Sequence, residues 1–288
     1  MKTNYLIVNV VSYSFKKHCL HLRTLVILAF LLLYIIYSVH EYKCCAYDYN
    51  ARIPALQLFI YFMCDPRKSI GVYVCWILFI CNTPIVNSNN YAIRIRVNSI
   101  YSVIGQQIYY LISTILYLSI VVLFIGVAIL NIIDLTIEWG TFFKSCWYAE
   151  LLNLVEGRIQ LDYTVIEAFL LLFILNVILL NIMWQIMYTI NFTFNTTAGI
   201  LIALMLVLVH YTIWCNGPFW ILWISPVSLV DLVHLDIHGR LKVPSLNYAF
   251  KYLLLLSTAL FGVNILIQFK HRSNLIYTYE GGNHHGSH

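Results

Sequence analysis

Three residues in the last quarter of the chain have a spacing that would suit a metal ion. His234, Asp236 and His238 alternate along the sequence, so on an extended segment their side chains would share one face and could ligate a divalent cation. An exposed polar turn that follows an apolar stretch explains the same pattern, and we favour that interpretation. An enzyme acting on lipids would need a cluster of carboxylates, histidines or a nucleophile near one membrane interface. The only candidate, 231–238 with Asp134 and Glu138, is too sparse. We therefore predict no metal, no cofactor and no catalytic site.

Other chemistry-bearing motifs are missing or weak. The sequence contains no GxxxxGK[ST] phosphate loop, no HExxH and no GxSxG, so any ATP hydrolysis linked to this protein must take place on another chain. The eight cysteines form no CxxC pair. A disulfide among Cys44, Cys45 and Cys64 and a purely apolar role for these residues both stay open. Lysine and arginine are dispersed, which indicates no nucleic-acid partner.

Polar side chains inside the apolar stretches are amides rather than charges. They are Asn176, Asn181 and Gln185 on one stretch and Asn264 on another. Two interpretations stay open: these amides line a translocation path, or they form hydrogen bonds between helices. The scarcity of buried carboxylates disfavours a transporter driven by protons or sodium.

The composition predicts that membrane-spanning helices position these side chains. Of 288 residues, 61% are hydrophobic and 10% are charged, whereas soluble domains carry about 25% charged residues. We expect an all-α integral membrane protein with membrane lipids around it. Six stretches are long and apolar enough to cross a bilayer, namely 23–39, 69–86, 107–133, 168–190, 196–214 and 250–269.

Three further segments complete the predicted domain organisation around a six-helix transmembrane domain, 23–269. Residues 1–22 have the pattern of an amphipathic segment in the membrane interface, with an irregular leader as the alternative. Residues 219–234 are apolar but interrupted by Pro226, which favours a re-entrant outer hairpin before the last helix. Residues 270–288 are expected to be a disordered cytoplasmic tail.

The charge distribution predicts the orientation in the cell membrane. If both termini are cytoplasmic, the inner segments hold eight of the 17 Lys and Arg but only Glu280 of the 12 acidic residues. The longer outer segments then hold nine basic and 11 acidic residues. Because Lys and Arg are denser on the inner side, the positive-inside rule favours cytoplasmic termini. The inner loop 87–106, with Arg94, Arg96 and no acid, is where we expect a soluble partner to bind.

The order of these parts resembles the permease subunits of ABC-2 type exporters. That family has an amphipathic N-terminal segment, six spans, a cytoplasmic coupling element between spans two and three, and a re-entrant outer hairpin before the last span. The string YAIRIRVNSIYSVIGQQIYYLIST looks like the family's basic loop running into its third helix. The resemblance covers nearly the whole chain through architecture rather than through tight motifs.

The resemblance implies a function, partners and a set of contact residues. The chain would be the permease of an ATP-driven exporter of amphipathic or lipidic cargo. Its partners would be a cytoplasmic ATP-binding subunit and a second permease protomer, identical or homologous. The family's coupling contact carries over to six residues: Arg94, Arg96, Asn98, Ser99, Ile100 and Tyr101. Binding of lipid headgroups is the alternative role for the two arginines, and a non-transporting scaffold, immunity or sensor protein is the alternative function.

Overall fold

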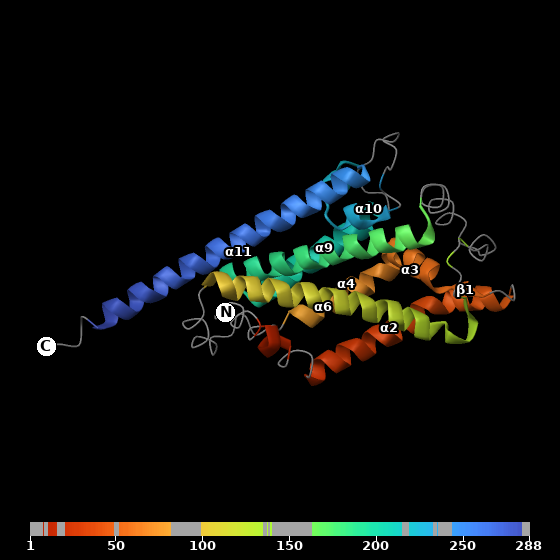
Figure 1. Cartoon of the computed structure of the whole chain (residues 1–288), viewed down its shortest axis with the longest axis horizontal. Helices are drawn as coiled ribbons and strands as arrows, with labels where there is room; N and C mark the ends of the chain where they lie inside the picture. Colours follow the sequence, from red (N-terminus) through yellow and green to blue (C-terminus); the bar gives the residue numbers. More distant parts are fainter. Residues whose placement is uncertain are drawn as a thin grey trace.

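The computed structural model describes most of the chain as one bundle of helices (Figure 1). The described residues are 8, 11–15, 21–48, 52–81, 99–134, 137, 139, 163–214, 219–232, 235 and 244–283. The α-helices are α2 (Leu22–Asp48), α3 (Ala55–Cys64), α4 (Pro66–Ile80), α6 (Ser99–Ala128), α9 (Val165–Thr193), α10 (Thr196–Trp214) and α11 (Leu246–Asn283).

Six of these helices alternate in direction through the bundle. At the start of α2, Arg23 donates to the carbonyl of Leu78 at the end of α4 (3.3 Å), and near the end of α2, Glu41 pairs with Lys68 at the start of α4 (3.0 Å). Helices α2 and α4 are therefore antiparallel. Helices α2, α6 and α10 begin at one end of the bundle, which we call the Ser99 end, and α4, α9 and α11 begin at the opposite end, the α3 end (Figure 1).

Four helices are long and apolar enough to cross a membrane. They are Leu22–Cys44, Val103–Ala128, Val165–Thr193 and Leu246–Lys270, and they are candidates for the predicted spans 23–39, 107–133, 168–190 and 250–269. The other two predicted spans correspond to shorter helices. Helix α4 has 15 residues and α10 has 19, which gives about 22 and 28 Å of rise against a hydrocarbon core of about 30 Å. Four of the six predicted spans are therefore helices long and apolar enough to cross a membrane.

Local sequence explains where two of the helices begin. Thr164 and Glu167 form a capping box at the start of α9, in which each side chain satisfies a backbone N–H of the other residue. Asp65 caps α4 by accepting from the N–H of Arg67 (3.0 Å), and Pro66 follows in the first turn, where a missing N–H is harmless. Both starts lie at the α3 end of the bundle.

A short sheet and two 3-10 helices also lie at the α3 end. Strands β1 (Ile53–Pro54) and β2 (Ile133–Asp134) pair in parallel. Strand β1 follows α2 and β2 follows α6. Because these two helices run in the same direction, the segments that follow them lie side by side at the same end of the bundle. The segment predicted to be re-entrant contains the 3-10 helices η4 (Phe219–Trp223) and η5 (Ser228–Val230), on either side of Pro226. A third 3-10 helix, η2 (Leu130–Ile132), follows α6.

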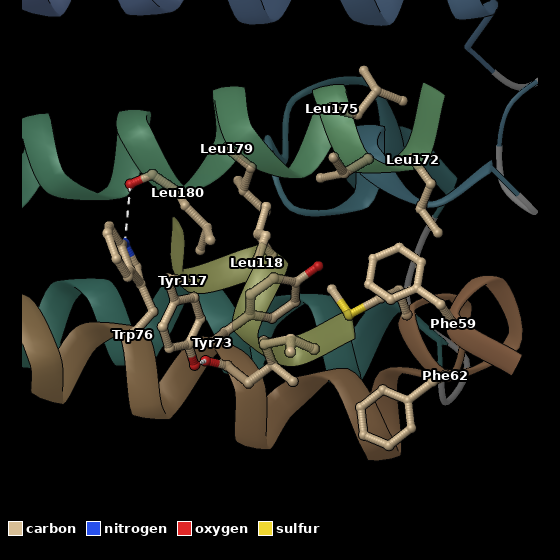
Figure 2. Close-up of a cluster of buried hydrophobic side chains, with 14 of the residues drawn as sticks. Phe59, Phe62, Tyr73, Trp76, Tyr117, Leu118, Leu172, Leu175, Leu179 and Leu180 are labelled. Atoms are coloured by element: carbon tan, nitrogen blue, oxygen red, sulfur yellow. Dashed lines mark hydrogen bonds between the residues drawn. The ribbon is translucent and has the colours of Figure 1, made fainter. Parts of the chain in front are cut away.

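An aromatic core lies where α3, α4, α6 and α9 meet (Figure 2). The indole N–H of Trp76 donates to the carbonyl of Leu180 (3.2 Å), and the hydroxyl of Tyr117 donates to the carbonyl of Val72 (2.7 Å). Phe59 packs edge-on against Phe169, with ring centroids 5.1 Å apart. Because lipid chains are as apolar as these side chains, close packing and interhelical hydrogen bonds must hold such a bundle together.

The outward faces of the long helices carry large apolar side chains. Helix α2 exposes residues such as Leu25, Phe30 and Leu33, and α11 exposes Leu255 and Leu266. Such surfaces on several helices suit contact with lipid rather than water.

Helical structure extends beyond the predicted spans toward both ends of the chain. The described part of the N-terminal segment is helical, and Val11 and Phe15 pack against the core while Val8 and Tyr13 are exposed. At the other end, α11 continues to Asn283, so most of the 270–288 tail that we expected to be disordered is helical.

Candidate functional site

A group of uncharged polar side chains connects α6, α9 and α11 inside the bundle. We call it the polar seam. Its members on α9 share a face because they recur at three- and four-residue intervals. The seam comprises Gln107, Asn181, Gln185, Tyr188, Thr189, Ser257, Asn264 and Gln268.

Gln107 joins two turns of α9 through both ends of its amide. Its Nε2 donates to Oδ1 of Asn181 (3.0 Å), and its Oε1 accepts from Nε2 of Gln185 (3.3 Å). The Nε2 of Gln185 also lies 3.3 Å from the hydroxyl of Ser257 on α11. Gln185 is thus the residue at which all three helices meet.

The seam continues between α9 and α11 toward the Ser99 end. The hydroxyl of Thr189 lies 2.7 Å from Oδ1 of Asn264 and 2.8 Å from the carbonyl of Gln185, and it has one hydrogen to share between them. One turn further, the amide of Gln268 donates to the hydroxyl of Tyr188. Because both helices run the same way, Gln185 and Thr189 of α9 meet Ser257 and Asn264 of α11 in the same order.

Two buried polar atoms of the seam have no hydrogen-bond partner among the described residues. They are Oε1 of Gln185 and Nδ2 of Asn264, and both residues are 0% exposed. A buried amide end without a partner loses its hydration and gains nothing in return, at about 1–3 kcal/mol for each group. The seam therefore contains one unmet acceptor and one unmet donor.

Asn176 lies apart from the seam, next to the aromatic core. Its Oδ1 accepts from the hydroxyl of Tyr73 (2.8 Å), and its Nδ2 donates to the carbonyl of Leu172 (2.8 Å). The structure thus brings together Asn181, Gln185 and Asn264 and separates the fourth predicted path residue from them. All four make hydrogen bonds to another helix.

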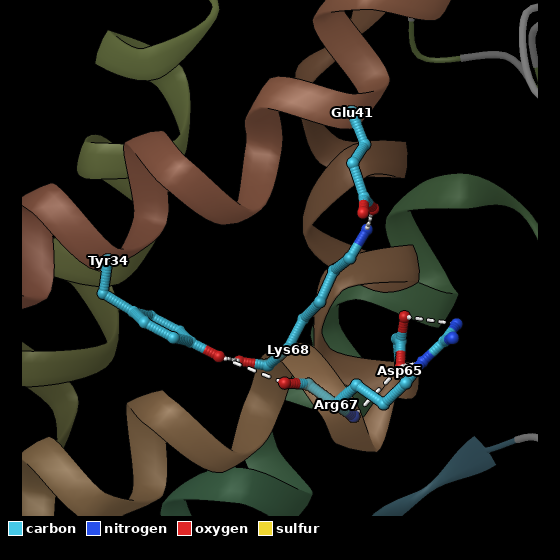
Figure 3. Close-up of polar contacts among 5 residues, drawn as sticks. All are labelled: Tyr34, Glu41, Asp65, Arg67 and Lys68. Atoms are coloured by element: carbon cyan, nitrogen blue, oxygen red, sulfur yellow. Dashed lines mark hydrogen bonds and ion pairs between the residues drawn. The ribbon is translucent and has the colours of Figure 1, made fainter.

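A charged group at the α3 end ties α2 to the start of α4 (Figure 3). Lys68 pairs with Glu41 at 3.0 Å, and its ammonium lies 3.8 Å from the centre of the Tyr42 ring. The Lys68 side chain is 9% exposed and that of Glu41 is 57% exposed.

A buried thiol and carboxylate connect α3 to the segment after η5. Burial raises the pKa of the Cys64 thiol, and the neighbouring Asp231, which accepts a hydrogen bond from it, raises it further. The thiol therefore stays protonated near neutral pH and is a poor nucleophile. Cys44 and Cys64 are both free, one exposed and one buried.

Several predicted site residues fall outside the described part of the chain. These are Arg94, Arg96 and Asn98 of the coupling contact, together with His234, Asp236 and His238. Ser99, Ile100 and Tyr101 form the first turn of α6. Within the described residues, no three His, Cys, Asp or Glu side chains are arranged to hold a metal ion.

No protein family, curated protein or solved structure matches this chain. Functional inference therefore depends on the arrangement of the bundle and on the chemistry of its interior.

Sequence reasoning missed part of the seam. Thr189 continues the i, i+4 series of Asn181 and Gln185, and this spacing could have identified it. Gln107 opens a predicted span, where an amide is easily taken for a headgroup contact. Ser257 gave no signal, because its role depends on which face of α11 meets α9.

Proposed function

We propose that this chain is the permease subunit of an ATP-driven exporter of the ABC-2 type. The observation that carries the proposal is the alternation of six helices, which brings the start of α6 and the turn between α9 and α10 to the same end of the bundle. A coupling element that precedes α6 would then lie beside the starts of α2 and α10. An ATP-binding subunit docked at that end could push on several helices at once.

In this proposal α4 and α10 cross the membrane together with the four longer helices, and both termini are cytoplasmic. The segment 219–234 forms the re-entrant hairpin on the outer side. The burial of Ser225, Val227 and Leu229 supports this placement, because these side chains pack into the bundle although the described residues of the segment form no long helix. The cytoplasmic side is then the Ser99 end, as the density of Lys and Arg predicts.

The proposed transport mechanism is alternating access. Closure of two ATP-binding subunits would move the coupling elements of two permease protomers and shift each bundle between inward and outward states. The cargo is amphipathic or lipidic, because the seam offers hydrogen bonds but no charge. Separation of α9 from α11 would break few hydrogen bonds and would expose those amides to cargo.

The deciding experiment is a pull-down of the tagged chain from its native cells in mild detergent, with mass spectrometry of what binds. We expect a soluble ATPase with Walker motifs to be recovered, and to be lost from the double variant Arg94→Glu and Arg96→Glu. Lys270→Glu with Arg272→Glu is the matched control, because it makes the same change of charge in another inner segment. Equal binding by both double variants would overturn the coupling site, and recovery of no ATPase would overturn the permease.

A second candidate function is a non-transporting membrane scaffold or sensor. It is favoured by the hydrogen bonds that Asn176, Asn181, Gln185 and Asn264 make to neighbouring helices, since amides used for cohesion need no cargo. A scaffold would be recovered from the same pull-down with other membrane proteins and without any ATPase.

A further inference from the structure

The two unmet amide ends of the polar seam belong to neighbouring helices, Oε1 of Gln185 to α9 and Nδ2 of Asn264 to α11. The Thr189 hydroxyl is 2.7 Å from Asn264 Oδ1 and 2.8 Å from the backbone carbonyl of Gln185. The side chain of Gln185 is directed to Gln107 and Ser257 instead. Gln185 and Asn264 are each fully buried, and neither Oε1 of the first nor Nδ2 of the second has a partner among the described residues. Two such groups in one apolar interface are costly unless a guest molecule satisfies them.

The chemistry of the two ends defines the guest. The nitrogen and oxygen of the Asn264 amide could be exchanged by a 180° turn of the group. In either orientation one end faces Thr189 and the other end has no hydrogen-bond partner among the described residues. The guest must therefore offer either a donor or an acceptor at that position, and a hydroxyl group does both. Every member of the seam is uncharged, so a charged guest would lose its hydration without a counter-charge.

We propose that a neutral hydroxyl group, from water or from the headgroup of a neutral amphiphile, binds between α9 and α11 to the side-chain amide of Asn264. An amphiphile would reach the site from the lipid phase over a short distance. Asn264 is buried, but Val263 and Leu266 beside it on α11 are exposed. The site is a property of the folded chain and does not depend on transport.

The test uses the unaltered full-length chain in a phosphocholine detergent, which carries no hydroxyl of its own. With Asn and Gln side chains labelled with 15N, NMR cross-peaks between the amide protons and water report contact with solvent. The matched internal control is Asn176, an equally buried amide on α9 whose two ends are both bonded to protein. Loss of one signal in Asn264→Ser or in Asn264→Asp assigns Asn264, and Asn176→Ser assigns the control.

The same sample then receives 1,2-dioctanoylglycerol, a neutral amphiphile with one hydroxyl, or its acetate ester, which has none. If water is the guest, Asn264 shows water cross-peaks that Asn176 lacks, and neither compound changes them. If an amphiphile is the guest, the free alcohol shifts the Asn264 signal, removes any water cross-peak and gives contacts of its own, while the ester does none of these. An Asn264 amide without contact to water or to the alcohol overturns the proposal. This result is separate from the pull-down, which tests the exporter.

Discussion

At the scale of single residues, Gly71 determines how closely α2 can approach α4. A Cβ atom added at Gly71 would lie 2.3 Å from ring atoms of Tyr34, far inside van der Waals contact. The Tyr34 hydroxyl lies 3.1 Å from the carbonyl of Arg67 and 3.0 Å from that of Lys68, just before Gly71 in the chain, and shares its one hydrogen between them (Figure 3). The ring therefore lies against Gly71, and its hydroxyl contacts the first turn of α4.

We predict that Gly71→Ala destabilises the fold, because Tyr34 must move and lose these contacts. Overpacking of this kind costs about 1–3 kcal/mol, and the thermal unfolding midpoint in detergent should fall. Gly126→Ala is the matched control, since a Cβ there meets nothing within 4 Å. The control should unfold no earlier than the natural chain, because alanine favours helix by about 1 kcal/mol over glycine. Equal midpoints for the two variants would contradict the proposed role of Gly71.

At the scale of elements, α2 is attached to the bundle near both of its ends. Near its start, the guanidinium of Arg23 reaches the Leu78 carbonyl (3.3 Å) and the Cys81 sulfur (2.8 Å). Near its end, Glu41 binds Lys68. Between these points much of α2 faces outward with apolar side chains. A helix with so much lipid-exposed surface depends on its few polar contacts for its position.

We predict a small favourable coupling between Glu41 and Lys68. Because Glu41 is 57% exposed, solvent screens the pair, and the coupling should be about 0.2–1 kcal/mol. A double-mutant cycle of Glu41→Gln and Lys68→Met, followed by unfolding in mixed micelles, measures it. The Lys68→Met change should be tolerated, since its apolar side chain still packs on Tyr42. A coupling of zero or of opposite sign would mean that the pair does not hold α2 in place.

At the scale of the whole molecule, the alternation of helices determines which connections share a side of the membrane. The turn between α9 and α10 around Asn195 lies at the Ser99 end, and the capping box at Thr164 lies at the α3 end. If the charge asymmetry sets the orientation, the first is cytoplasmic and the second is outside.

Topology reporters fused at these two points test the arrangement. Green fluorescent protein, which folds in the cytoplasm, should fluoresce when fused after Asn195 and stay dark when fused after Thr164. Alkaline phosphatase, which is active only outside, should show the reverse. A reversed pattern at both points would mean that the protein has the opposite orientation in the membrane. The coupling loop would then lie on the side without cytoplasmic ATPases. The same pattern at both points would mean that α9 does not cross the membrane.

Sequence alone determined the class of this protein and the positions of its four longest helices. Composition and stretch length are sufficient for that, because the bilayer requires about 20 consecutive apolar residues of any spanning helix. The two shorter helices, α4 and α10, show the limit of the same rule. An apolar stretch predicts burial in lipid or protein but does not say where backbone geometry will end the helix.

Tertiary structure alone decided how the interior polar groups are paired. Sequence identified Asn176 and Gln185 as polar residues on one helix, but their partners, Tyr73 and Ser257, are 103 and 72 residues away. Such pairs depend on which helix faces come together, and helix packing is set by the shapes of many apolar side chains at once. The separation of Asn176 from the seam, and the two unmet amide ends within it, follow from that packing and from no local signal.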